Sequence, residues 1–442
     1  MFVWKERDGK PAVGAILDTL KCPDGRSIFL GVRPLSQVFH MLHIHFVAGR
    51  LGLGLIVPFF QTTRSESFVL NRAVSGTKPT GSTALLPRRR NELLAGHEDP
   101  IYVIQEPGGR NPKRHVVHYE GFYEYGDDDI DNVIASILHA SRQCRDGVVV
   151  TASLITAANY GPVLQALELL AGMRSRNSIG PIFLVACENT LSAHEVFQDP
   201  DLCNWIPTGL HRHVTCVHAL VDRVCIGLEE GQEGDRSVVV VRAEEYGSLK
   251  LELTPESEPL RSKLQGSGVE FTRHVAVEKQ IKNWLLNGSH WLVALAAFQE
   301  SKGDHRMKLN EFLQANPERL RSAEAVMEEM REGVAVILRR APQYAAFVRD
   351  VDPDQYLEGA ARAILDRFLS NEDPITRILA RFQAPTPEAP ATIQAFSKRL
   401  TDRVDEPISA YAEAKGFPPL AATRSVHSLV RLIASGTYIR AA

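Results

Sequence analysis

The first half of the chain alternates short apolar runs with amphipathic stretches. The runs are rich in branched and aromatic residues, as buried strands are, and the stretches between them repeat apolar residues at helical spacing. The predicted strands cover residues 42–47, 67–72, 101–106, 115–125, 147–156 and 181–190, and the predicted helices cover 127–143 and 163–175. This alternation predicts an α/β fold with a doubly wound sheet. Two more apolar stretches, 213–228 and 236–253, are expected to complete or extend the sheet.

The second half has a different pattern. Apolar residues at i, i+3 and i+4 predict long helices over 322–341, 354–369 and 392–416. The polar stretch 254–268, which contains prolines and glycines, is the best candidate boundary between the two halves. A chain of 442 residues also exceeds what one hydrophobic core usually covers. We therefore predict three units: a strand-and-turn extension over 1–40, an α/β domain over 41–265 and a mainly α-helical domain over 266–442.

Composition narrows the choice of partners. The chain is 44% hydrophobic and 23% charged, as ordinary globular proteins are, and its net charge of -3 gives no electrostatic reason to expect nucleic acid or an anionic membrane. The six cysteines form no CxxC pair, which suits a reducing compartment, and neither a signal peptide nor a membrane-spanning run is evident. We expect a cytoplasmic protein with a small-molecule ligand and no metal, since no metal-ligand spacing is present.

A glycine-punctuated loop follows the first predicted strand. In a GxGxxG nucleotide loop, Gly49 and Gly52 fit the second and third glycines, and Val47 stands at the first, where the turn needs positive φ. A β-branched residue is a poor occupant of such a turn, so a loop without a ligand is an open alternative. With a ligand, the cofactor-binding residues are expected to be Gly49, Arg50, Leu51 and Gly52.

The ends of other predicted strands supply further candidates, because ligands of open α/β sheets bind at the carboxyl ends of strands. The second strand ends in Asn71 and Arg72 without a carboxylate, which favours NADP over NAD, the alternative being a solvated arginine. Thr151 closes another strand and is expected near the cofactor. Asn189 follows a further strand, where it is either a functional side chain or a turn residue.

The stretch KNWLLNGSH places three polar side chains inside an apolar run. At about 100° per residue in an α-helix, Lys282, Asn287 and His290 share an arc of about 140°. A lysine among apolar neighbours needs partners or a lowered pKa, the condition under which it serves as a general base. Asparagine can donate to a developing oxyanion, and histidine can bind a hydroxyl. The alternative is structural: Lys282 extends to solvent, Asn287 and Gly288 end the helix, and His290 belongs to the core.

At this point the residues resemble a family. KNWLLNGSH is similar to the KxxxxNxxH signature of the polyol-specific long-chain dehydrogenases, which include mannitol 2-dehydrogenase and mannitol-1-phosphate 5-dehydrogenase. HFVAGRLGLG resembles their HFGAGxxGxG loop, VACEN their strand-end ACEN, HALVDRV their VDRI segment and AFSKRLTDRVDEP their C-terminal stretch. These matches run in the family's order from about residue 41 to the C-terminus.

The resemblance implies a Rossmann-like NAD(P)-binding domain, a mainly helical C-terminal domain and an active site between them. It implies that Lys282 is the general base, that Asn189 and Asn287 polarise the reacting oxygen, that His290 binds substrate, and that no metal takes part. Val47, in place of the family's first glycine, and Cys225, where a proline usually follows VDRI, depart from the pattern. So do residues 1–40, which have no counterpart.

The expected function is an NAD(P)-dependent oxidoreductase that interconverts a secondary alcohol and a ketone on a polyol, sugar or sugar phosphate. Two alternatives stay open. One is an epimerase that uses tightly bound NAD(P) transiently, without net redox change. The other is a non-catalytic dinucleotide-binding protein, which only Val47 supports. The sequence leaves the exact substrate and the oligomeric state undetermined.

Overall fold

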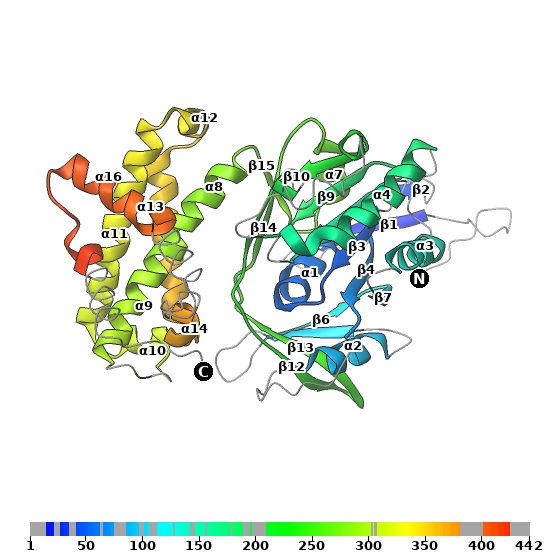
Figure 1. Cartoon of the computed structure of the whole chain (residues 1–442), viewed down its shortest axis with the longest axis horizontal. Coiled ribbons are helices and arrows are strands. Elements are labelled where there is room, and N and C mark those ends of the chain that lie inside the picture. The colour runs from blue at the N-terminus through cyan, green and yellow to red at the C-terminus, as the bar shows by residue number, and fades with distance from the viewer. Residues whose placement is uncertain are drawn as a thin grey trace.

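The structure of the protein is a computed structural model. It describes residues 15–21, 27–34, 41–61, 65–74, 85–96, 101–105, 113–126, 129–141, 146–154, 157–176, 179–188, 195–196, 209–301, 304, 307–380 and 401–424. Two parts lie side by side in Figure 1, one built around strands and one built of helices, and α8 leads from the first into the second. The N-terminal strands β1 (Ala15–Lys21) and β2 (Ser27–Pro34) form an antiparallel pair of their own.

A sheet of parallel strands forms the centre of the first part. Its strands are β3 (Met41–Phe46), β4 (Ser65–Arg72), β7 (Gly121–Tyr125), β8 (Val148–Ala152), β9 (Ile182–Ala186) and β10 (Val214–Val217). They lie in the order β10-β9-β8-β3-β4-β7. Counted along the chain, this is the order 3-2-1-4-5-6 of a Rossmann fold read from the β7 edge. The order reverses between β3 and β8, where such folds bind their ligand.

Alternate residues of the sheet face two different layers. Leu42, Ile44 and Val150 share one core with α3 (Ile130–Ala140) and α4 (Gly161–Ser175). Met41 and Val149 point the other way, toward a π-helical turn (Gly52–Ile56) and the short helix α1 (Val57–Phe60). This alternation follows from the two-residue period of a strand.

Two smaller sheets complete the first part. One contains β11 (Ala219–Asp222), β14 (Ser248–Glu252) and β15 (Glu270–Thr272), with α7 (Glu258–Lys263) between the last two in sequence. The other contains β12 (Cys225–Glu233), β13 (Arg236–Ala243), β5 (Ile101–Gln105) and β6 (Arg114–His118), with α2 (Pro87–Ala95) against β13. Of the apolar stretches at 213–228 and 236–253, only β10 therefore extends the central sheet. The other strands of these stretches pair among themselves, with β5 and with β15.

The second part is a helical bundle. Its helices are α8 (Val275–Ile281), α9 (Ser289–Glu300), α10 (Leu309–Gln314), α11 (Pro317–Arg340), α12 (Ala345–Asp350), α13 (Pro353–Ser370), α14 (Ile375–Ala380) and α16 (Glu406–Lys415). Asn316 and Asp352 cap α11 and α13, each accepting a hydrogen bond from a backbone N–H of the first turn. The apolar faces of these helices meet in one continuous core. The predicted fold class, Rossmann-like followed by mainly helical, is thus confirmed.

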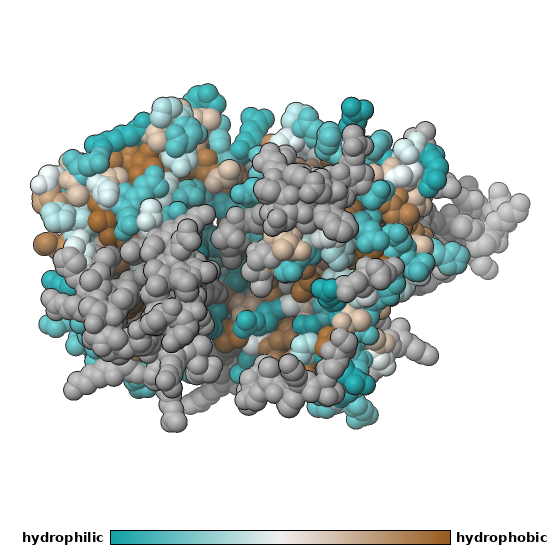
Figure 2. Space-filling model, viewed as in Figure 1, coloured by the Kyte–Doolittle hydropathy of each residue, from teal (hydrophilic) through white to brown (hydrophobic). Residues whose placement is uncertain are grey.

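Figure 2 shows hydrophilic residues spread over both parts of the face it draws, with hydrophobic residues in smaller groups between them. Among the described residues, no helix is long and apolar enough to cross a bilayer.

Candidate active site

The predicted polar segment does not form an α-helix. Residues Lys282–Gly288 are π-helical and join α8 to α9 without a break. The angle of about 100° per residue expected for an α-helix is therefore wrong here. Because a π-helix closes its turns with i→i+5 hydrogen bonds, residues five apart come close to the same face. Lys282 and Asn287 are five apart, so the wider turn brings together two side chains that an α-helix would separate.

Close packing explains the glycine at the end of this segment. A Cβ at Gly288 would lie 2.5 Å from the backbone oxygen of Arg403 and 3.0 Å from Met330 Cε. The Arg403 oxygen belongs to a second π-helical turn (Thr401–Asp405), which precedes α16. On the inner face Trp284 and Leu285 are buried in the bundle core. The segment is thus packed against neighbours on two sides, and its polar face lines a cavity.

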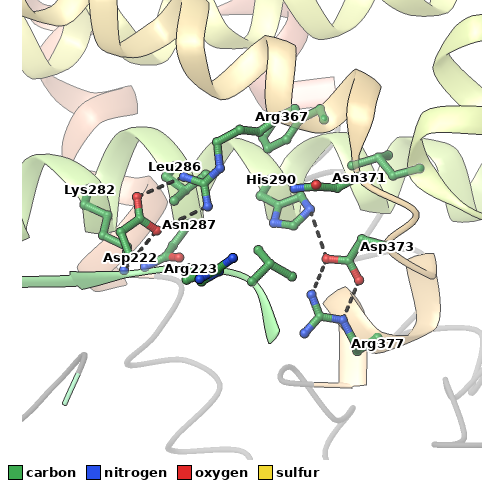
Figure 3. Close-up of a pocket in the computed structure, with 13 residues that line it drawn as sticks. Asp222, Arg223, Lys282, Leu286, Asn287, His290, Arg367, Asn371, Asp373 and Arg377 are labelled. Carbon is green, nitrogen blue, oxygen red and sulfur yellow. Dashed lines mark hydrogen bonds and ion pairs between the residues drawn. The ribbon is translucent and has the colours of Figure 1, made fainter. Parts of the chain in front are cut away.

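Lys282, Asn287 and His290 line one cavity between the bundle and the strands that follow the central sheet (Figure 3). The polar residues of its wall are Asp222, Arg223, Lys282, Asn287, His290, Arg367, Asn371, Asp373 and Arg377. They come from the end of β11, from the π-helical segment and α9, from α13, and from α14 with the residues before it. The structure therefore brings together three of the four residues predicted to be catalytic. The fourth, Asn189, lies outside the described residues.

The Lys282 ammonium has two oxygen partners at the end of β11. Its Nζ donates to the backbone oxygen of Val221 at 2.6 Å and lies 3.5 Å from Asp222 Oδ1. Burial by itself raises the pKa of Asp222, but the charges of Lys282 and Arg367 outweigh burial and hold that pKa below its usual value. A charged carboxylate therefore faces the lysine.

Arg367 connects this carboxylate to a second one. Its guanidinium donates to both oxygens of Asp222, at 2.9 and 3.2 Å, and to both oxygens of Glu244, at 2.6 and 3.1 Å. Glu244 also accepts from Asn371 Nδ2 at 2.6 Å and from the Val224 N–H. Burial lowers the pKa of Arg367, and the two carboxylates more than reverse this effect. The result is a buried ion cluster that fixes the cavity wall next to Lys282.

His290 sits at the other end of the cavity. Its ring stacks on Phe368, with ring centroids 4.7 Å apart, and its Nε2 lies 3.8 Å from Asp373 Oδ2. Asp373 is 2% exposed, and both of its oxygens accept from Arg377, as Figure 3 shows. Asn287 Nδ2 makes a long bond of 3.4 Å to Asn283. The cavity thus offers hydrogen-bond donors and acceptors along its length.

Asp222, Arg367, Asp373 and Arg377 are site residues that no motif or spacing in the sequence predicted. A signal existed for two of them. Asp222 ends an apolar strand inside the HALVDRV segment, and Arg367 occupies a buried position on the apolar face of α13 beside Ile364. A charged residue at an apolar-face position needs a buried partner. The identity of that partner, more than a hundred residues away in sequence, was not visible.

The glycine loop lies at the carboxyl end of β3, next to the point where the strand order reverses. Among the described residues, Val47 is the one non-glycine residue with positive φ, at 80°. The expectation that this position needs positive φ is confirmed, and a valine adopts it. A Cβ at Gly52 would lie 2.2 Å from His45 Nε2 and 2.6 Å from the Val47 oxygen, so only glycine fits. The loop therefore combines a left-handed residue at position 47 with a close approach that only glycine allows at position 52.

Other residues predicted to bind cofactor are placed as follows. Gly49 donates from its N–H to the Val47 oxygen at 2.7 Å, and Leu51 packs against the core beneath the first turn. The Arg50 guanidinium reaches the backbone oxygen of Ile226 in β12 at 3.1 Å.

Three predicted residues lie at strand ends. Asn71 is buried and donates to Asn91 of α2 at 2.6 Å, whereas Arg72 is exposed. Thr151 is fully buried beneath the loop, where its hydroxyl contacts two histidine rings. No group of three or more potential metal ligands is clustered within the described part of the chain.

Comparisons with known proteins show which solved structures have a similar fold. A scan against family models and a sequence search of curated proteins found no match. Solved structures do match. Mannitol 2-dehydrogenase of Pseudomonas fluorescens, solved as a ternary complex with NAD and D-mannitol, shares 16% identity over 91% of this chain and 85% of its own, with a TM-score of 0.50. A D-sorbitol dehydrogenase in substrate-free form shares 11% identity over 89% of this chain and 92% of its own, with a TM-score of 0.48.

The likeness to mannitol 2-dehydrogenase is one of fold. It spans nearly the whole chain at an identity too low to transfer residue roles. The chain therefore shares the overall fold of that enzyme, a Rossmann-like part followed by a helical part.

Proposed function

We propose that the protein is an NAD(P)-dependent oxidoreductase that interconverts a secondary alcohol and a ketone on a polyol, sugar or sugar phosphate. The observation that carries this proposal is the shared cavity of Lys282, Asn287 and His290. A glycine loop at the reversal point of the sheet supports it. The guanidinium of Arg223, which lines the cavity, donates to the backbone oxygen of Gly54, two residues beyond Gly52. Cavity and loop are thus tied together directly.

Lys282 is the proposed general base during alcohol oxidation and the proton donor during ketone reduction. Its Nζ is held by Val221 and Asp222, so the amine occupies one position in the cavity. The Asn287 amide, on the same face of the π-helical segment, donates to the oxygen that gains charge. His290, on its Phe368 platform, binds a further hydroxyl. A bound nicotinamide would accept or supply the hydride.

The residues at the loop fit a dinucleotide. The backbone of Gly49–Gly52, which opens into a helix, would face the pyrophosphate, with Arg50 and Leu51 in that first turn. At the ribose, Asn71 is neutral and bonded to Asn91, and the Arg72 side chain is exposed. These features favour a 2′-phosphate and hence NADP(H), although the mannitol 2-dehydrogenase structure was solved with NAD bound. Titration with NADH and NADPH decides between them.

The cavity wall favours a polyhydroxylated substrate. It presents both carboxylates and cationic donors, which can bind hydroxyl groups along an extended chain. A substrate that also carries an anionic group, as a sugar phosphate does, would find cationic partners in Arg223, Arg367 and Arg377.

The test is a panel of polyols, sugars and sugar phosphates assayed by the absorbance of reduced nicotinamide, first with wild type and then with Lys282→Ala. Loss of the general base is expected to lower kcat at least about 10²-fold. The control is Lys263→Ala, because Lys263 is also half-buried and also donates to a backbone oxygen, that of Asp146, but lies outside the cavity. Near wild-type turnover of Lys282→Ala on the best substrate would refute the lysine mechanism.

The same panel separates the epimerase alternative. Product formed without any absorbance change, by protein that purifies with bound cofactor, would replace net oxidoreduction with epimerisation.

A further inference from the structure

We propose that a buried hydrogen-bonded chain, made of Ser67, His43, Thr151 and His45, holds Val47 in its left-handed conformation and so takes the place of the missing glycine. We call these four residues the histidine chain. The proposal rests on the proposed function only in treating the loop after β3 as a nucleotide loop.

Val47 needs such support because its conformation is strained. A β-branched residue at a φ of 80° clashes with its own backbone, which makes this conformation unfavourable by itself. Glycine would adopt the same φ without that cost. Something else in the structure must therefore favour this conformation over the ordinary one.

The backbone oxygen of Val47 is where this support acts. It accepts from His45 Nε2 at 3.0 Å and from the Gly49 N–H at 2.7 Å, while the Val47 N–H donates to the Leu70 oxygen at 2.8 Å. A single net hydrogen bond in a protein contributes only modestly to stability. The three bonds act together against the strain of the left-handed conformation. Removing the histidine donor shifts this balance toward the relaxed conformation.

The direction of every bond in the histidine chain follows from its partners. A carbonyl only accepts, so His45 Nε2 carries the hydrogen and His45 Nδ1 is an acceptor. It accepts from the Thr151 hydroxyl at 2.7 Å. The Thr151 oxygen in turn accepts from His43 Nε2 at 2.9 Å, and His43 Nδ1 accepts from the Ser67 hydroxyl at 3.0 Å. The histidine chain thus runs from Ser67 in β4 through His43 in β3 and Thr151 in β8 to His45 and the loop. It fixes the tautomer of His45.

Burial makes this arrangement unambiguous. His43, His45 and Thr151 are 0% exposed, and His43 also stacks on Phe60 with ring centroids 4.5 Å apart. Desolvation lowers the pKa of both histidines, so both rings are neutral and each has one donor and one acceptor, as the chain requires. The His45 ring also occupies the space that a side chain at position 52 would need, which links Gly52 to the same unit.

The test is a set of four proteins: wild type, His45→Ala, Val47→Gly and the double variant. In nucleotide-free crystal structures, residue 47 is expected to turn to negative φ in His45→Ala and to keep positive φ in the double variant. Val47 still near 80° in His45→Ala would overturn the proposal. This readout needs no cofactor, so it stands even if the loop binds none.

Fluorescence titration of the same proteins with NADH and NADPH gives the second readout. His45→Ala is expected to weaken binding at least about tenfold when residue 47 is valine and less than about threefold when it is glycine, a coupling that a double-mutant cycle isolates. Equal losses in both backgrounds would mean that His45 merely packs. Absence of binding by wild type would instead refute the proposed function.

A pair of isosteric variants covers the case in which His45→Ala does not fold. Thr151→Val removes the central hydroxyl with little change of shape, and Thr151→Ser retains it. Only Thr151→Val should weaken dinucleotide binding, and Val47→Gly should restore it. Equal effects of the two substitutions would contradict the proposal.

Discussion

Replacing Arg367 by methionine should destabilise the protein strongly, because it removes the centre of the buried ion cluster. Arg367 is 8% exposed and makes four hydrogen bonds of 2.6–3.2 Å to the carboxylates of Asp222 and Glu244. Without it, Asp222 keeps Lys282, but Glu244, which is 2% exposed, loses its cationic partner. Breaking a buried pair by removing one member costs about 3–5 kcal/mol, because the other charge is left buried.

The assay is urea unfolding followed by circular dichroism at neutral pH, with Arg362→Met as the control. Arg362 lies on the same helix, but its partner is the exposed Glu358, so its loss should change the free energy of unfolding by less than about 1 kcal/mol. Adding Glu244→Gln to Arg367→Met should recover part of the loss, since the orphaned charge is gone. Equal destabilisation by the two arginine substitutions would refute the reasoning.

Two further predictions concern stability. Gly288→Ala should destabilise the protein by about 1–3 kcal/mol, because its Cβ would meet the Arg403 oxygen. Gly359→Ala has no atom within 4 Å of its Cβ and should stabilise α13 by about 0.5–1 kcal/mol. Thermal unfolding of the two variants tests this difference, and similar shifts in Tm would contradict the close contact at Gly288. The pKa of His45, lowered by burial to about 4 from 6.5, means that the unfolded chain binds a proton that the folded one does not. Stability should therefore fall as pH drops from about 6.5 toward 4, with His45 contributing up to about 1.4 kcal/mol per pH unit and His43, whose pKa burial also lowers, adding to the fall. His45→Gln should reduce this slope in urea unfolding, and an unchanged slope would rule out His45 as one of its sources.

The sequence predicted the central sheet well because burial on both faces leaves a plain pattern. The runs at 147–156 and 181–190 contain the unbroken apolar stretches 148–150 and 182–187, and each contains a strand of that sheet. Sheet membership elsewhere was not predictable. The segments at 101–106 and 236–253 have ordinary strand patterns, yet β5 pairs with β13 in a separate sheet. Alternation of side chains specifies which face of a strand is buried, but not which strand lies beside it.

The part of the candidate site that lies in one short segment of the chain was predictable from the sequence. Lys282, Asn287 and His290 are close in sequence, and the structure places all three on one cavity. Arg367 and Asp373 reach the same cavity from parts of the chain that only tertiary packing brings near. Their contribution is electrostatic, and the pairing of Arg367 with Asp222 across 145 positions leaves no periodic trace in the sequence.

The two segments proposed to act on cofactor and substrate both depart from regular backbone geometry. Val47 is left-handed where its residue type disfavours it, and Lys282–Gly288 is π-helical where its sequence predicts an α-helix. Local rules fail most often at functional sites, because the surrounding structure can hold a strained or rare conformation that chemistry needs. In this chain the surroundings are identifiable: the histidine chain beneath Val47, and the close approach of Arg403 to Gly288. On a helical wheel at about 100° per residue, Lys282 and Asn287 lie about 140° apart, and the π-helical turn brings them closer together on one face. The departure from α-helical geometry therefore tightens a grouping of polar side chains that the wheel already predicted.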